Sequence, residues 1–165
     1  MTSLSSSELP GEDQDKFDVG KDAVWSVSSY QEGYGVEELT DPSLHTYWKS
    51  SGPLPHQVNI QFKKKTTLDD VWLYVDCNMD KANTPSKVAI RCGRDFNHLQ
   101  EVKVVNLPKP TGWVLIPLYD PEGKYIKAKV LQIAVLSVLG IGRNACIRCI
   151  KVHSPAESNN DAIEA

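Results

Sequence analysis

The sequence predicts an all-β protein, on the basis of two observations. Short segments alternate apolar and polar residues, and turn-forming residues separate these segments. No stretch of ten or more residues keeps the 3.6-residue apolar spacing of an amphipathic helix, so an α/β fold is not expected. Seven or eight strands in a chain of 165 residues favour a β-sandwich, for which jelly-roll connectivity is one common closure.

The first clear strand is QVNIQF, where Val58, Ile60 and Phe62 fall on one face and polar residues on the other. The same signal returns in six further segments, at residues 69–76, 86–93, 100–105, 112–118, 129–137 and 146–153. Residues 130–136 are apolar on both faces, which predicts a strand at the centre of a sheet.

The two ends of the chain differ from this body in composition. Residues 1–20 and 156–165 are rich in acids and small polar residues, and we expect both to be disordered tails around one domain at 21–155. The tails carry charges of −4 and −3 of the net −3, which leaves +4 for the body. Because the sequence pI is about 5.8, a nucleic-acid partner is not expected, and Lys63–Lys65 are interpreted as a solvated turn in preference to a phosphate-binding patch.

The sequence has neither the pattern of a membrane-spanning helix nor that of a secretory signal. No apolar run approaches the roughly 18 residues of a membrane-spanning helix, so no membrane partner is expected. The N-terminus has neither the basic start nor the apolar region of a secretory signal, which predicts an intracellular protein.

The segment LTDPSLHTYWKSSGPLPH combines turn-forming residues with two adjacent aromatics. Asp41 followed by Pro42 is typical of a helix start, which predicts one or two helical turns over residues 43–48. Leu44 and Trp48 would then share a face and plug the open end of the core. Tyr47 is open to a structural role or to contact with a partner.

Catalytic motifs are absent, and we expect neither an enzyme nor a cofactor. The four histidines are dispersed, and His56 is interpreted as a structural hydrogen-bonding group in preference to a base. Cys146 and Cys149 form a CxxC pair, which is found in zinc and redox sites. Because no second pair accompanies it, inert thiols are favoured over both, and no metal is expected. Function is then expected in three loops, at residues 31–35, 78–84 and 137–145.

Several segments together resemble one family, the DOC domains of subunit 10 of the anaphase-promoting complex, or cyclosome. They are AVWSVSS, GYGVEELTDPSLHTYWKSSGPLPHQVNIQF, TPSKVAIRCG, FNHLQEV, GWVLIPL, LQIAVLS and GRNACIRCIKVHSP. The resemblance covers about residues 21–155. It implies a galactose-binding-like jelly roll, in agreement with the strand pattern.

The resemblance also implies a function. Such proteins are noncatalytic subunits of a ubiquitin ligase of cell division, and act with a WD40 coactivator as co-receptor for the destruction-box degron of mitotic substrates. This implies a nuclear and cytoplasmic protein that promotes processive ubiquitination of cell-cycle regulators. Degron-binding positions carried over from the family are Asn83, Gly142, Arg143 and Asn144.

The chain departs from the family pattern at two places. The loop that commonly has the sequence Asn-Gly-Arg-Asp-Thr-His is Ile141 to Cys146 here, and it keeps only Gly142 and Arg143. Family members commonly end in Ile-Arg, which docks into a TPR subunit, whereas this chain ends NNDAIEA, so that docking is not expected. Two alternatives stay open: a DOC-like docking domain of another ubiquitin ligase, and a carbohydrate-binding module.

Overall fold

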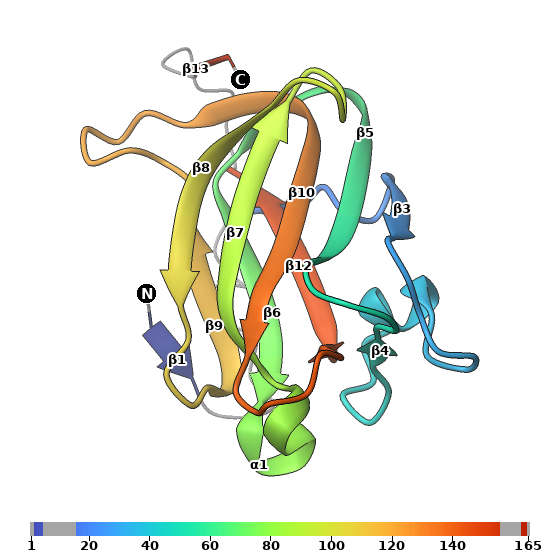
Figure 1. Ribbon diagram of the computed structural model, residues 1–165. Helices are drawn as coiled ribbons and strands as arrows, with labels where there is room; N and C mark the ends of the chain where they lie inside the picture. Colours follow the sequence, from blue (N-terminus) through green and yellow to red (C-terminus); the bar gives the residue numbers. More distant parts are fainter. Residues whose placement is uncertain (1, 5–15, 156–162, 165) are drawn as a thin grey trace.

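Two antiparallel sheets packed face to face form the protein in the computed structural model, which describes residues 2–4, 16–155 and 163–164 (Figure 1). One sheet has the order β1 (Thr2–Leu4), β9 (Thr111–Pro117), β6 (Asp70–Asp76), β12 (Cys149–Ser154), β2 (Phe17–Asp18). The other has the order β3 (Val24–Val27), β5 (His56–Leu68), β10 (Ile126–Val138), β7 (Pro85–Gly93), β8 (Leu99–Asn106), with β13 (Ile163–Glu164) parallel to β10.

Small elements complete the chain. β4 (Trp48–Lys49) pairs with β11 (Cys146–Ile147), and the helical turns are η1 (Val36–Leu39), α1 (Cys77–Asp80) and η2 (Lys81–Asn83). None of the helices in the part of the chain that the structure describes is long and apolar enough to cross a membrane.

The seven predicted strand segments all form strands, and β10 lies at the centre of its sheet between β5 and β7, as its two-sided apolar pattern predicted. The inward faces of the two sheets supply one core. Its largest fully buried side chains are Trp48, Leu39, Ile60, Leu68, Leu73, Ile90, Leu107, Ile116, Leu118, Leu131, Ile133 and Ile147. The segment expected as one strand at 146–153 is divided at Arg148 into β11 and β12.

The expected helical turns over residues 43–48 are wrong. The Asp41 carboxylate accepts a hydrogen bond from the Ser43 backbone N–H at 2.9 Å, but a turn at Leu44 and His45 follows, and Trp48 begins β4. Extended backbone is required at Trp48 because it pairs with Ile147 of β11. Helix propensity is thus overridden by a strand partner that is distant in the sequence.

Leu44 and Trp48 therefore do not share a face. Trp48 is fully buried in the core, and its indole N–H donates to the Ser29 carbonyl oxygen at 2.8 Å. Leu44 packs instead against a second apolar cluster, formed by Trp72, Tyr74, Trp113 and Cys149. The expected joint plug is replaced by one core residue and one residue that covers the separate cluster.

The ordered domain begins before the expected boundary at residue 20. Phe17 and Asp18 pair with β12 as β2, and the Val19 N–H donates to the Val152 carbonyl at 3.0 Å. The Lys16 ammonium lies 2.9 Å from Asp69 and 2.7 Å from Asp70. Two buried carboxylates thus hold this acidic segment in place. The rest of the predicted tails, at residues 1, 5–15, 156–162 and 165, lies outside the described residues, while β1 and β13 pair with the sheets.

Candidate functional site

Two of the three predicted loops lie against each other at the end of the sandwich that carries α1 (Figure 1). The Leu139 N–H donates to the Thr84 carbonyl at 2.9 Å, and the Gly140 N–H donates to the Ala82 carbonyl at 3.0 Å. The cause is the register of the sheet, in which Val138 at the end of β10 is paired with Pro85 at the start of β7. The loop that leaves β10 must therefore meet the segment that enters β7.

Gly140 allows this close approach. A Cβ atom at this position would lie 2.3 Å from the Ala82 Cβ, which is far inside van der Waals contact. At Gly142 the nearest atom to an added Cβ is the Asn83 side-chain oxygen, at 4.0 Å, so there the space is open. The first glycine is therefore required by packing and the second is not.

The far end of the loop is also fixed. His56 forms a hydrogen bond through Nε2 with the Arg143 carbonyl oxygen, which is the structural kind of role favoured for it from the sequence. Ser50 and Ala145 exchange two hydrogen bonds, one through the Ser50 hydroxyl at 2.7 Å and one between backbone groups at 3.0 Å. Residues 139–145 are thus anchored on both sides, and the turn between the anchors presents its side chains to solvent.

The structure places the four predicted degron-binding residues on this turn and beside it. Gly142 and Arg143 are exposed, Asn144 is half-buried, and Asn83 borders Gly142. Ile141 is fully exposed and lies in the same turn. Exposed apolar side chains at this end also include Met79 and Leu139. The surface therefore combines apolar groups with one guanidinium.

An ion pair that sequence reasoning missed lies beneath this surface. Arg148 Nε and Nη2 donate to the two carboxylate oxygens of Asp80, at 3.0 Å and 2.7 Å, and both side chains are buried. Arg148 Nη1 also donates to the Leu44 carbonyl at 2.9 Å. The hydrogen bonds to Asp80 raise the pKa of Arg148. This bidentate pair ties α1 to the junction between β11 and β12.

Two tyrosines extend the ion pair to the third predicted loop. The Arg148 guanidinium lies 5.0 Å from the centre of the Tyr47 ring, and the Tyr34 ring stacks on Tyr47 with centroids 4.8 Å apart. Burial, and next the hydrogen bond with Tyr34, raises the pKa of Tyr47. Tyr34 belongs to the loop at residues 31–35, so all three predicted loops meet at this end.

One signal in the sequence pointed to this cluster. Arg148 is a single charged residue inside the apolar run CIRCI, at a place where alternation predicted a strand. A charge in such a position requires a buried partner. The partner itself, Asp80, lies 68 residues away and had no local signature.

The two cysteines of the CxxC pair are buried. All four cysteines are free, and burial raises the pKa of Cys146 to about 12 and that of Cys149 to about 11. At neutral pH both are therefore thiols, whereas zinc ligation and nucleophilic chemistry use the thiolate. Among residues 2–4, 16–155 and 163–164, no group of His, Cys, Asp or Glu is placed to hold a metal ion.

The loop cluster combines different kinds of exposed side chain on a fixed backbone. Its exposed groups are apolar side chains, a guanidinium and amides, held on a backbone that hydrogen bonds fix at several points. Such a surface suits an extended peptide, since preorganisation lowers the entropic cost of binding.

Comparisons with known proteins agree on family and fold. The family model described as "Anaphase-promoting complex, subunit 10" matches residues 4–165. The proteins named anaphase-promoting complex subunit 10 in Drosophila melanogaster and Homo sapiens are 47% and 43% identical to this chain. The matches cover 89% and 87% of the chain and 75% and 77% of the relatives.

Solved structures of low sequence identity share the fold. The family 32 CBM of Clostridium perfringens NanJ, determined in complex with galactose, superposes with a TM-score of 0.70 at 15% identity, covering 84% of this chain and 99% of that one. CBM32-3 from a family 31 glycoside hydrolase of the same organism gives 0.73 at 17% identity, covering 89% and 99%. These likenesses establish the galactose-binding-like jelly roll, and no binding activity is carried over from them.

Proposed function

The chain belongs to the family of anaphase-promoting complex subunit 10, and from this premise we propose that it is a noncatalytic subunit of that ubiquitin ligase. In this role it acts as co-receptor for the destruction-box degron, beside a WD40 coactivator, in the nucleus and cytoplasm. Ubiquitin transfer itself would be performed by other subunits. The proposal gives the protein one task, which is to hold substrate.

The observation that carries the proposal is the anchored loop at residues 139–145. Its hydrogen bonds to Ala82, Thr84, Ser50 and His56 fix the backbone, while Arg143 remains exposed. A short degron bound by two receptors gains residence time through effective concentration, even where each contact alone is weak. Longer residence on the ligase allows more ubiquitin transfers in each encounter.

The altered loop gives this chain its own version of the site. Asn144 keeps hydrogen-bonding groups but has no charge, and Ile141 offers an apolar surface. We expect this loop to bind degrons in which an apolar side chain lies near a hydrogen-bond acceptor for Arg143.

The proposal is tested with reconstituted ligase. Replacing Arg143 and Asn144 by Ala is expected to shorten the ubiquitin chains that are added per encounter on a destruction-box substrate. A loss of about 1.4 kcal/mol of binding free energy corresponds to a roughly tenfold loss of processivity. A substrate recruited through a different degron is the control and should be unaffected. Unchanged processivity on the destruction-box substrate would remove these residues from the site.

Membership of the complex is tested separately. Immunoprecipitation from dividing cells should recover the subunits of the anaphase-promoting complex. Recovery of another ubiquitin ligase instead would favour the alternative of a DOC-like docking domain elsewhere. Binding on a glycan array would favour the carbohydrate-binding alternative.

A further inference from the structure

The stacked pair of Tyr34 and Tyr47 forms an aromatic surface beside the anchored loop at residues 139–145. The two ring centroids lie 4.8 Å apart, at an interplanar angle of 10°. The Arg148 guanidinium lies over the Tyr47 ring, 5.0 Å from its centre. Because one face of a ring cannot hold both a guanidinium and a second ring, Tyr47 lies between Arg148 and Tyr34. The other face of Tyr34 ends the stack, and this residue is 38% exposed.

The backbone around Tyr34 is fixed on β4. The Gln31 N–H donates to the Lys49 carbonyl at 2.9 Å, and the Lys49 N–H donates to the Tyr34 carbonyl at 3.1 Å. The chain between them makes a tight turn, in which the Tyr34 N–H donates to the Gln31 carbonyl at 2.9 Å. Gly33 takes the left-handed position of this turn, with a φ of 90°. A fixed backbone therefore presents the exposed ring, which lowers the entropic cost of binding.

The aromatic stack is continuous with the loop to which the proposed function assigns the substrate. Lys49 of β4 pairs with Cys146 of β11, and the Ser50 N–H donates to the Ala145 carbonyl at 3.0 Å. Tyr34 and the end of the loop thus lie on opposite sides of β4, about two strand spacings of roughly 4.8 Å apart. An extended peptide that contacts the loop would reach Tyr34 within about three to five further residues.

The segment that carries Tyr34 is acidic. Residues 31–39 include three glutamates and no basic residue. A Cβ atom added to Gly35 would lie 2.8 Å from a carboxylate oxygen of Glu37, so this carboxylate lies beside the residue that follows Tyr34. None of the three glutamates forms an ion pair within the part of the chain that the structure describes. Their negative charges attract a cationic group to the exposed ring.

We propose that Tyr34 is a specificity-determining residue for the substrate, and that its exposed face stacks on the guanidinium of an arginine in the bound peptide. The inference rests on the proposed function, since it takes that peptide to be the degron-bearing substrate. A guanidinium suits both features of this surface, because it is positively charged and its plane stacks on aromatic rings. A lysine ammonium would meet the charge but offers no planar surface.

A direct test measures binding of N-acetyl-arginine amide to the full chain by NMR, with the citrulline analogue as ligand control. The arginine probe should shift the ring-proton resonances of Tyr34 and the amide resonances of Gly33 and Gly35. The citrulline probe has a similar planar group without the charge, and it should shift these resonances less than half as far. Equal shifts with both probes, or larger shifts elsewhere on the surface, would overturn the inference.

A second test uses reconstituted ligase and a substrate with arginines on either side of its destruction box. Tyr34→Leu is expected to lower processivity about two- to fivefold, which corresponds to one exposed cation–π contact. Tyr34→Phe keeps the ring and should retain the processivity of the unmodified chain. The matched control is Tyr119→Leu, since Tyr119 is 42% exposed and packs edge-to-face on Tyr125. This control should leave processivity unchanged.

A substrate whose flanking arginines are replaced by Gln separates recognition from a structural role. On that substrate, Tyr34→Leu should no longer lower processivity, and an equal loss on both substrates would overturn the inference. Loss in the double Arg143→Ala, Asn144→Ala variant without loss in Tyr34→Leu would overturn this inference alone. Loss in Tyr34→Leu alone would support it and contradict the assignment of the loop. Unchanged processivity in all of these variants would overturn both.

Discussion

At the residue scale, Arg148 contacts several separate segments at the loop end of the molecule. It reaches Asp80 with two hydrogen bonds, the Leu44 carbonyl with a third, and the ring of Tyr47 with its guanidinium face. These contacts join segments that are 68 and 104 residues apart in the sequence. One side chain therefore links α1 to the segment that precedes β4.

We expect replacement of Arg148 by Leu to lower the free energy of unfolding by about 3–5 kcal/mol. The physical reason is that Asp80 would remain buried without its counter-charge. The control is Glu101→Gln, which removes the exposed carboxylate that lies 3.7 Å from Arg91 and should cost at most about 1 kcal/mol. Urea denaturation followed by tryptophan fluorescence measures both. Equal losses in the two variants would contradict the central role of Arg148.

At the scale of elements, the loop after β10 is defined by its neighbours. The loop begins beside the segment at residues 81–84, to which it is hydrogen-bonded, and it ends at β11, where Cys146 pairs with Lys49. Between these points the loop has little freedom, although its sequence is rich in glycine. The rigidity comes from hydrogen bonds to other elements and from the contact of Gly140 with Ala82.

Replacement of Gly140 by Ala is expected to destabilise the protein by about 1–3 kcal/mol, as other insertions of a methyl group into tight packing do. Gly142→Ala is the matched control, since its added Cβ would meet nothing nearer than 4.0 Å. It should change the unfolding free energy by less than about 1 kcal/mol. Thermal or urea unfolding distinguishes the two, and equal stability of both variants would show that the loop shifts without cost.

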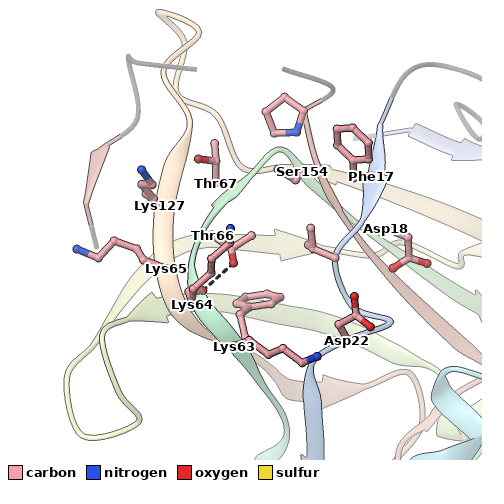
Figure 2. A pocket seen from close by; sticks show the side chains of 13 residues that line it. Phe17, Asp18, Asp22, Lys63, Lys64, Lys65, Thr66, Thr67, Lys127 and Ser154 are labelled. Carbon is pink, nitrogen blue, oxygen red and sulfur yellow. Dashed lines mark hydrogen bonds between the residues drawn. The ribbon is translucent and has the colours of Figure 1, made fainter. Parts of the chain in front are cut away.

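At the scale of the whole molecule, the sandwich separates two surfaces. β5 runs between them, with His56 against the loop cluster and Lys64 in the groove between β5 and the segment around β2 (Figure 2). Eight residues of strand at about 3.3 Å each place these surfaces roughly 26 Å apart.

The strands were predictable because each carries its own signal. Alternation in QVNIQF and the two-sided apolar run at 130–136 depend only on local sequence, and both segments form strands of the expected kind. The helical turn predicted at 43–48 does not form, because pairing with β11 requires extended backbone at the end of this segment. The division of the last strand at Arg148 depends on a buried partner from another element, which local pattern does not reveal.

The sequence by itself determined the all-β class, the central strand, the positions of the three candidate loops and the family. These follow from local periodicity, turn chemistry and motif order, which are written into consecutive residues. Only the tertiary structure decided that the three loops meet through Arg148, that Leu44 and Trp48 belong to different clusters, and that Lys63–Lys65 line a groove. Each depends on strand register and burial between distant segments, and such contacts leave no periodic trace in the chain.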